Sequence, residues 1–225
     1  EAEAATLAAW RSGRRSPQAA ARGKTRRRRA AAAGCDHRRR GGVVDKAAYR
    51  RFSEIRDGFR ERVAGWTAAL PGLAEAQRAL ARETGDDYAV ETPIVYNRAL
   101  DEIGSGDEVA WVVVADNPGK REQESAMNRY LVGRSGMVAE RFFARELGVD
   151  FRRQAVIINK TPVHTPKTAQ LRRLARLYPE ARDILDESQR FMAGIVPELQ
   201  ACFGARVWVM GLSEEIGRAS CRERG

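Results

Sequence analysis

The stretch WVVVADNPGKREQ, from Trp111 to Gln123, decides the fold. A continuous run of β-branched residues ends abruptly in an acid, an amide, a proline and a glycine. An apolar run without alternation is typical of a strand that is covered on both faces of a sheet. Proline fixes φ, and glycine adopts conformations that other residues avoid, so the strand must stop here. The stretch therefore predicts a buried strand that delivers a polar loop at its carboxyl end.

Two more buried strands follow, separated by helices. The predicted strands are VAWVVVA (109–115), QAVIIN (154–159) and ARVWVMG (205–211), and the predicted helices cover 136–147, 167–177 and 180–203. This alternation favours a parallel sheet with helices on both faces. Upstream, apolar residues recur every three or four positions from Val44 to Arg82, with a break at Pro71-Gly72. We therefore expect a three-layer α/β/α fold with a central, mainly parallel sheet, preceded by an N-terminal helical segment.

Positive charge is concentrated at the start of the chain. The net charge is +10, and residues 1–42 hold 12 Lys and Arg against 3 Asp and Glu, whereas residues 43–214 hold 25 of each. Residues 1–42 contain few large apolar side chains, so we expect this tail to be disordered. One interpretation is a basic arm that binds the phosphates of a nucleic acid. The other, which we favour because basic low-complexity tails often carry no fold information, is translated DNA upstream of a start at Val43 or Val44, since no Met precedes Met127.

The last residues also look foreign to the fold. The segment EIGRASCRER, followed by Gly225, resembles the translation of a common sequencing-adapter DNA. We expect native sequence to stop near Ser213 or Glu214. The expected organisation is a basic tail at 1–42, helices and a connector at 43–108, an incomplete α/β core at 109–214 and an adapter-derived tail at 215–225.

Composition and spacing exclude several classes of protein. No apolar run approaches the about 18 residues of a membrane span, and no signal peptide is recognised, so we expect a cytoplasmic protein without membrane contact. The three cysteines lack the spacing of a zinc or iron–sulfur site, and no metal or cofactor is expected. Walker, dinucleotide-binding and GxSxG motifs are absent. A monomer is expected.

The candidate site lies in the loops that leave the strands. In open α/β sheets, ligands bind beyond the carboxyl ends of the strands, so the loops ADNPGKREQ and NKTPVHTPKT should face one another. Asp116 and Asn117 can orient or activate a water, although Asn-Pro-Gly is also ordinary turn chemistry. The amide of Asn159 offers one donor group and one acceptor, which suits a base edge.

Other candidates are weaker when taken alone. In Gly133-Arg134-Ser135-Gly136, Ser135 is expected to cap a helix whose N–H groups favour an anion. A lone loop histidine such as His164 is more often structural than catalytic. Phosphate contacts are expected from a basic strip of Lys120, Arg121, Arg134, Lys160 and Lys167.

The order of these motifs resembles the uracil-DNA glycosylase superfamily. ADNPG is similar to the family's first catalytic motif, which takes forms such as GQDPY, GEAPG or GINPG. RYLVGRSGMVAERFF resembles the PFVGRAG segment and its helix, and VIINKTPVHTPKT resembles the strand and loop that supply a base-reading asparagine. VWVMGLSE resembles a later strand. The resemblance covers 109–214, about half of the chain.

The resemblance implies a DNA-repair enzyme that hydrolyses the N-glycosidic bond of uracil or a related damaged base. Asp116 or Asn117 would place the water, and both remain open. Asn159 would hydrogen-bond the uracil edge, and Tyr130 and Leu131 would lie at the base, near where relatives carry a stacking Phe. The residues implied to line the pocket or meet phosphate are Pro118, Gly119, Gly133, Arg134, Ser135, Gly136 and His164.

The sequence also departs from the family pattern. Ala115 replaces the usual first glycine, Leu131 replaces the stacking Phe, and the four-cysteine cluster of some branches is absent. The second catalytic motif is expected beyond residue 214. The missing stacking Phe favours a second hypothesis, a relative that binds nucleotides or nucleic acid without cleavage, whereas the retained acid–amide–Pro–Gly loop and Asn159 favour the enzyme. A third hypothesis is a general α/β hydrolase that acts on free nucleosides.

Overall fold

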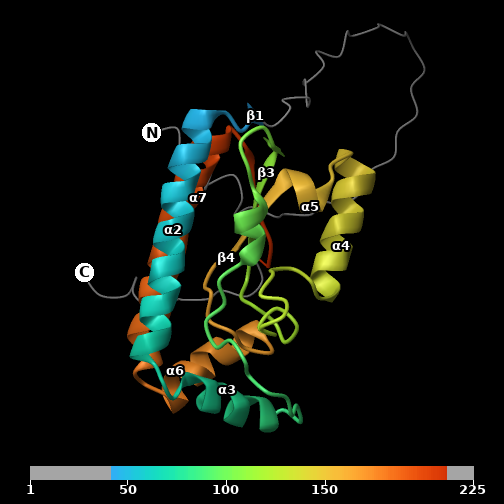
Figure 1. Ribbon diagram of the computed structural model, residues 1–225. Coiled ribbons are helices and arrows are strands. Elements are labelled where there is room, and N and C mark those ends of the chain that lie inside the picture. The colour runs from blue at the N-terminus through green and yellow to red at the C-terminus, as the bar shows by residue number, and fades with distance from the viewer. Residues whose placement is uncertain (1–41, 212–225) are drawn as a thin grey trace, which may run out of the picture. The chain divides into compact units, whose positions relative to one another are not determined.

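A parallel three-stranded sheet forms the centre of the protein (Figure 1). The computed structural model describes residues 42–211. Strand β3 (Trp111–Ala115) lies between β4 (Ala155–Asn159) and β5 (Arg206–Val209), and Ala115 pairs with Asn159 at the carboxyl end. All five residues of β3 are buried, as the unbroken apolar run predicts. The α/β class and the parallel sheet are therefore confirmed.

Some expectations concern residues outside the described range. They are the basic tail up to residue 41, the adapter-derived tail at 215–225 and the second catalytic motif beyond 214. Gly42, which was assigned to the tail, instead lies in strand β1 (Gly42–Val43). This strand pairs antiparallel with β2 (Glu108–Val109).

The predicted strand at 109–115 is divided at Ala110. Val109 belongs to the two-stranded sheet, and the central strand starts at Trp111. Ala110 N donates to Gln154 O at 2.8 Å, and Ala110 O accepts from Arg206 N at 3.0 Å. Because these bonds come from segments far along the chain, the local apolar pattern does not reveal the division.

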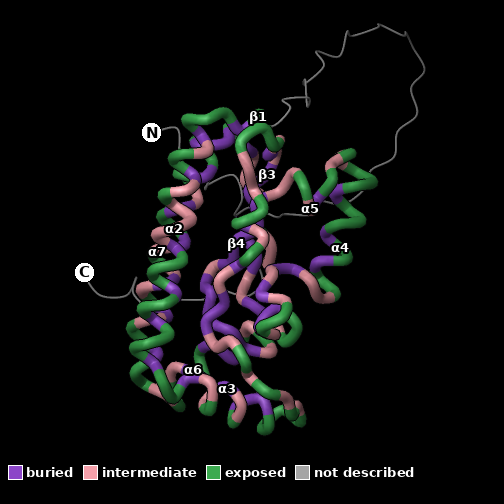
Figure 2. Tube along the Cα trace, viewed as in Figure 1, coloured by how far each residue is buried: buried purple, intermediate pink, exposed green. Residues whose placement is uncertain are grey.

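One face of the sheet packs against two long helices, α2 (Lys46–Ala69) and α7 (Ala181–Phe203), which run side by side (Figure 1). Their inward faces are buried stripes (Figure 2). The buried side chains of this cluster include Phe52, Phe59 and Trp66 of α2, Met192 and Leu199 of α7, and Val112, Val114, Val156 and Ile158 of the sheet. Pro197 lies inside α7, which continues through it and is not broken there.

The opposite face of the sheet packs against a shorter helical segment. It consists of α4 (Arg134–Phe142), a π-helical turn η2 (Phe143–Leu147) and α5 (Phe151–Gln154). Trp111 and Phe143 meet edge to face with ring centroids 5.4 Å apart, and this second cluster also includes Val113 and Ile157. Side chains alternate between the faces along each strand, which explains why two separate apolar clusters form.

Four shorter helical segments complete the part of the chain that the structure describes. They are α3 (Leu73–Arg82), the 3-10 turns η1 (Arg98–Glu102) and η3 (Thr168–Gln170), and α6 (Leu171–Leu177). As predicted, the upstream helical pattern forms two helices separated at Pro71-Gly72. None of the helices between residues 42 and 211 is long and apolar enough to cross a membrane.

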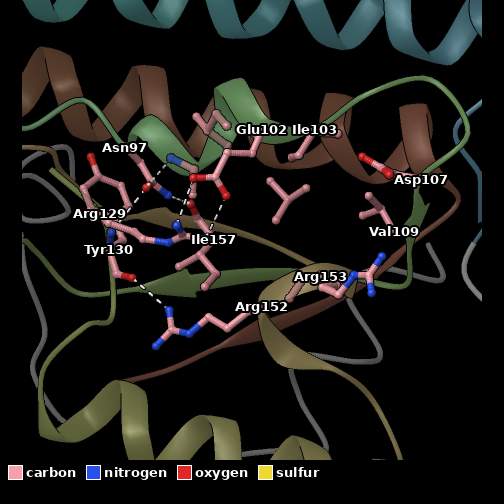
Figure 3. Close-up of a pocket in the computed structure, with 14 residues that line it drawn as sticks. Asn97, Glu102, Ile103, Asp107, Val109, Arg129, Tyr130, Arg152, Arg153 and Ile157 are labelled. Atoms are coloured by element: carbon pink, nitrogen blue, oxygen red, sulfur yellow. Dashed lines mark hydrogen bonds and ion pairs between the residues drawn. The ribbon is translucent and has the colours of Figure 1, made fainter. Parts of the chain in front are cut away.

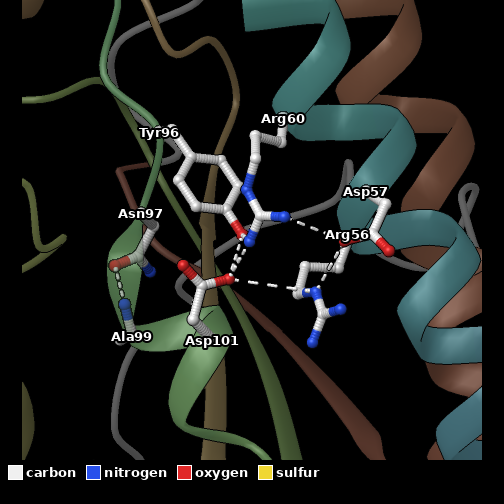
Figure 4. A network of polar contacts seen from close by, with 7 residues as sticks. All are labelled: Arg56, Asp57, Arg60, Tyr96, Asn97, Ala99 and Asp101. Atoms are coloured by element: carbon white, nitrogen blue, oxygen red, sulfur yellow. Dashed lines mark hydrogen bonds and ion pairs between the residues drawn. The ribbon is translucent and has the colours of Figure 1, made fainter.

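A polar network joins α2 to the connector that precedes β3 (Figure 4). Arg60 pairs with Asp57 and Asp101, and Tyr96 donates to Asp101 at 2.6 Å. Arg56 also bonds Asp57 at 2.9 Å. These contacts are largely solvent-exposed, so each contributes little stability, but they fix the connector against the helix. The helical segment and the α/β segment thus belong to one compact unit.

Candidate functional site

The ends of three strands bring an acid, a lysine and a glycine together. Asp116 follows β3, Lys160 follows β4, and Gly211 lies two residues after β5. The Lys160 ammonium donates to Asp116 Oδ1 at 2.5 Å and to the Gly211 carbonyl at 3.0 Å. The two charged side chains are 22% and 23% exposed, so this pair is held more firmly than one on the open surface.

Gly211 makes room for the Asp116 carboxylate. Its φ is +65°, and a Cβ atom there would lie 2.0 Å from Asp116 Oδ2. Any other residue would therefore be strained and would displace the carboxylate. The geometry of the acid thus depends on a glycine that follows a different strand.

Asn117 joins the two loops through side-chain hydrogen bonds. Its amide nitrogen donates to Thr165 Oγ1 at 3.0 Å and to Thr165 O at 3.2 Å, and its amide oxygen accepts from Thr168 at 2.8 Å. The Pro118 carbonyl accepts from Thr165 N at 3.3 Å. The two loops therefore face one another as expected. The amide groups of Asn117 are engaged in this contact, which distinguishes Asn117 from Asp116.

His164 does not face the crevice, which corrects the expectation of a pocket role. The ring is 0% exposed, with Nδ1 at 2.8 Å from Pro118 O and Nε2 at 2.8 Å from the Tyr88 hydroxyl. Burial lowers the pKa of His164 to about 4, so the imidazole is neutral near pH 7. The buried His164 ring therefore packs under the loops and is not exposed for contact with a phosphate.

Tyr130 and Leu131 are also core residues. The Tyr130 ring is 0% exposed, and its hydroxyl donates to Val95 O at 2.6 Å. Leu131 is 6% exposed and has a φ of +55°. A buried tyrosine needs a hydrogen-bond partner, and here a backbone carbonyl supplies it. The base contacts expected at these two positions stay predictions.

The GRSG segment forms the start of α4, but Ser135 is not its cap. Gly133 is the N-cap residue, without a side-chain hydrogen bond, and Arg134 and Ser135 are exposed inside the first turn. Gly136 is buried against the backbone of Leu131. The segment thus positions the turn at 131–133 rather than forming a capped anion site.

We expect Gly136→Ala to lower the free energy of unfolding by about 3 kcal/mol, because an added Cβ would lie 1.5 Å from Leu131 O. Urea unfolding of the variant measures this loss. Gly133→Ala is the matched control, since no atom lies within 4 Å of its Cβ position. The control should change stability by less than about 1 kcal/mol. Equal losses in the two variants would contradict the described turn.

Glu122 is a site residue that sequence reasoning missed. Its side chain is buried and accepts from Gly119 N at 3.3 Å. Burial raises the pKa of Glu122 to about 7, although backbone N–H groups of Gly119, Leu131 and Val132 and the charge of Arg152 oppose this shift. Glu122 therefore links the loop after β3 to the turn before α4. Strongly shifted carboxyls of this kind cluster at functional sites, but they also occur in structural networks.

The raised pKa of Glu122 predicts a pH-dependent loss of stability. A carboxyl with a folded pKa near 7 stabilises the fold fully below its ordinary value of 4.5, and this contribution disappears as pH rises through 7. Its size is about 3 kcal/mol. His164 acts in the opposite direction between pH 4 and 6.5, because its pKa is lowered to about 4.

The test is therefore a difference between two proteins. Relative to wild type, Glu122→Gln should gain stability as pH rises from 5 to 8, since only wild type must ionise a buried carboxyl. Urea unfolding at several pH values measures the free energy of unfolding of each protein. The contribution of His164 is the same in both proteins, so it drops out of the difference. Parallel curves across this range would show that the carboxyl is not buried as described.

Asn159 is the most unusual polar residue of the site. It ends β4, is 0% exposed, and neither its amide nitrogen nor its amide oxygen has a hydrogen-bond partner among residues 42–211. The residue adjoins a cavity of about 360 Å³ between the sheet and α7, while its pairing with Ala115 places its side chain on the same face as Ala115 and Ile157. The other lining residues are Val114, Lys160, Gln189, Met192, Ala193, Val196, Pro197 and Val209. A mostly apolar cavity with few polar groups is typical of a small-ligand site.

A second cavity, of about 260 Å³, lies near the amino end of β4 (Figure 3). Four of its polar side chains, those of Asn97, Glu102, Arg129 and Arg152, are paired within the protein. Arg129 bonds Glu102 through two contacts at 2.9 and 3.0 Å, Asn97 donates to Ile157 O, and Arg152 donates to Leu131 O. This pairing contrasts with Asn159 and makes the second cavity a weaker candidate for ligand binding.

The expected basic strip is partly neutralised. Lys120 pairs with Asp86, and Lys160 pairs with Asp116. Arg121, Arg134 and Lys167 are exposed. Within residues 42–211, no group of three or more His, Cys, Asp or Glu is placed to hold a metal ion.

The fold and the site together define a parallel α/β protein with a candidate ligand cavity near the carboxyl ends of its strands. No family model, curated protein or solved structure matches the chain. The functional argument therefore rests on the residues of the site.

Proposed function

We propose that the protein hydrolyses the N-glycosidic bond of uracil or a related damaged base in DNA. The observation that carries this proposal is Asn159, whose fully buried side-chain amide has no partner among residues 42–211 and lies at the carboxyl end of β4, where the residue adjoins a cavity of small-molecule size. Leaving a buried donor and acceptor unpaired costs about 1–3 kcal/mol for each group. Such a cost is understandable if a ligand supplies the missing partners.

Uracil provides the matching partners. Its edge carries an N–H donor beside a carbonyl acceptor, and one carboxamide can satisfy both. Cytosine presents the reverse pattern, with an amino donor and a ring-nitrogen acceptor, but a carboxamide held in one orientation pairs with only one of these patterns. A site built around buried polar groups rejects ligands that leave those groups unpaired. The proposal therefore includes discrimination between these two bases.

Asp116 is the better candidate to place the water. Lys160 engages Asp116 Oδ1, and we assign the other carboxylate oxygen to the water. The carboxylate also stabilises positive charge that develops on the sugar in the transition state. Asn117 keeps a positioning role, because its amide joins the two loops. The target nucleotide would be flipped out of the stack, and Arg121, Arg134 and Lys167 would contact phosphates.

The family assignment is part of the same proposal. Membership of the uracil-DNA glycosylase superfamily, its three-layer α/β/α arrangement and a monomeric DNA-binding form are inferred from the motif order and the strand-end site. One specific observation favours the second hypothesis, binding without cleavage. Lys160 already engages one carboxylate oxygen of Asp116, the proposed catalytic acid.

Base release from short oligonucleotides tests the proposal. We expect the protein to release uracil from a single-uracil oligonucleotide and to leave a matched thymine oligonucleotide intact. Chromatography of the free base measures the reaction without requiring strand cleavage. Release from free deoxyuridine but not from DNA would support the nucleoside hydrolase instead. DNA binding without release would support the non-catalytic relative.

A further inference from the structure

A basic stretch of the chain follows the second loop of the candidate site. The 20 residues from Lys160 to Pro179 contain five Lys and Arg and no Asp or Glu, whereas residues 43–214 as a whole hold 25 of each kind. Lys160 is paired with Asp116. The other four positive charges lie just before η3 or on α6, at Lys167, Arg172, Arg173 and Arg176. One short segment therefore carries positive charge that its neighbours in sequence do not offset.

The arginines of α6 share the outer face of this helix. Leu171 and Leu174 are buried and anchor the helix in the core. Arg172, Arg173 and Arg176 are exposed, and they lie on the opposite side of the helix, because each residue advances about 100° around the axis. Arg172 and Arg176 are four residues apart and are therefore neighbours on that face. The outer face of α6 thus presents arginines and no acidic side chain of its own.

Helix α6 is fixed relative to the candidate site. Thr168 lies three residues before the helix, and its hydroxyl donates to Asn117 Oδ1 at 2.8 Å. Gln170 Nε2 donates to Thr84 Oγ1 at 3.3 Å, and α6 packs beside α3 (Figure 1). Because the loop after β4 leads directly into η3 and α6, the basic face continues from the crevice.

The acids near this face neutralise only part of its charge. Arg173 pairs with Glu83 at 2.6 Å, but the two side chains are 52% and 39% exposed. An ion pair this exposed is weak, so a phosphate can replace Glu83. Within residues 42–211, no Asp or Glu forms an ion pair with Lys167 or Arg176. This face therefore has positive charge available for an anionic partner.

We propose that the outer face of α6 binds the phosphate backbone of DNA beside the candidate site. The choice of DNA as the partner rests on the proposed function. DNA carries a regular row of phosphates, and a guanidinium group can form two parallel hydrogen bonds with one of them. Such contacts fix the position of the duplex without reading its sequence. Arg172, Arg173 and Arg176 would thus hold the strand on one side of the flipped nucleotide.

Salt-dependent DNA binding tests this inference. Arg172→Gln/Arg176→Gln removes two charges from the proposed face, and Arg145→Gln/Arg153→Gln is the matched control. Both control residues are exposed and belong to the helical segment that leads into the amino end of β4. Fluorescence anisotropy with a uracil-free duplex measures the affinity of the full chain at several salt concentrations. The basic residues before position 42 are the same in every variant, so their contribution is shared.

We expect two changes in Arg172→Gln/Arg176→Gln. At about 0.1 M salt its affinity for the duplex should fall by about 10-fold, and the slope of log affinity against log salt should become shallower by about 2. A duplex with one uracil should lose affinity by the same factor, because phosphate contacts do not depend on the base. The control should bind like wild type, and urea unfolding should show that both variants fold.

The Nε–Hε signal of Arg176 gives a local measurement by NMR. This signal, assigned with Arg176→Gln, should shift when the uracil-free duplex is added to the wild-type protein. The corresponding signal of Arg153 should stay in place. A shift at Arg176 that appears with polyglutamate but not with the duplex would assign the face to an acidic protein and overturn the choice of DNA.

The outcomes separate this inference from the proposed function. Equal duplex binding by wild type and Arg172→Gln/Arg176→Gln, or an equal loss in the control, overturns the role of α6 even if uracil is released. A selective loss of duplex binding, in a protein that releases no base, supports the α6 face and removes the proposed glycosylase function.

Discussion

Asn159→Leu is expected to make the protein more stable and inactive. The substitution removes a buried donor and a buried acceptor that have no partner among residues 42–211, and leucine has a similar shape. The free energy of unfolding should therefore rise by about 1–3 kcal/mol. Base release should fall by about 1,000-fold, because the groups that recognise uracil are lost. Urea unfolding and the base-release assay measure the two effects.

Asn97→Leu is the matched control for this prediction. Asn97 is also a buried asparagine, but its amide donates to Ile157 O and accepts from Ala99 N and Tyr130 N. Leucine there leaves those backbone groups unpaired, so we expect a loss of about 3 kcal/mol. The two substitutions should thus change stability in opposite directions. Equal losses would mean that Asn159 has an unseen structural partner and is not held for a ligand.

Asp116→Asn and Asn117→Ala are expected to change different properties. The first should lower base release, and the second should lower the free energy of unfolding. Asp116→Asn keeps the shape but removes the charge, and base release should fall by about 100-fold to 1,000-fold. Its stability should change by less than about 1 kcal/mol, because the Lys160 pair is partly exposed. Asn117→Ala should instead lower the free energy of unfolding by about 2 kcal/mol, since it removes the contacts with Thr165 and Thr168.

Thr168→Val is the control for the hydrogen bonds that Asn117 makes between the two loops. It removes the hydroxyl that donates to Asn117 Oδ1 but leaves Asp116 and Asn159 untouched. We expect about half of the Asn117→Ala stability loss and little change in base release. If Asn117→Ala abolishes release at full stability while Asp116→Asn remains active, the assignment of the water to Asp116 is wrong.

The central fold was predictable because its signals are local. The β-branched run at 111–115 and the apolar segments at 155–159 and 206–209 form strands, and Pro71-Gly72 separates two helices, as expected. Each of these signals depends on residues that are neighbours in sequence. The division at Ala110 was missed, because it depends on hydrogen bonds to Gln154 and Arg206.

The roles of the site residues were harder to predict, because they depend on distant partners. Asn117 looks like a simple turn residue until Thr165 and Thr168 are brought against it. A glutamate at position 122 would ordinarily be solvated, yet the turn at 131–132 buries it. Tyr130 was expected near a base from motif order alone, and its burial beneath the loop became visible only in three dimensions.

Asn159 shows where sequence and structure complement each other. Its place at the end of an apolar strand indicated a base-reading amide, and the structure adds that both amide groups are buried and lack partners within the described part of the chain. Lys160 was interpreted only as a phosphate contact. Its pairing with Asp116 follows from the parallel register, which places two strand ends side by side.

The side-chain amide of Asn159 offers the most direct test of the account. Its ¹⁵N–¹H₂ signals, assigned with Asn159→Leu, can be followed by NMR while free uracil or free cytosine is added. The account predicts that uracil shifts these signals toward a hydrogen-bonded position and that cytosine leaves them unchanged. No shift with uracil, or an equal shift with both bases, would contradict the claim that this buried amide is kept for a uracil edge.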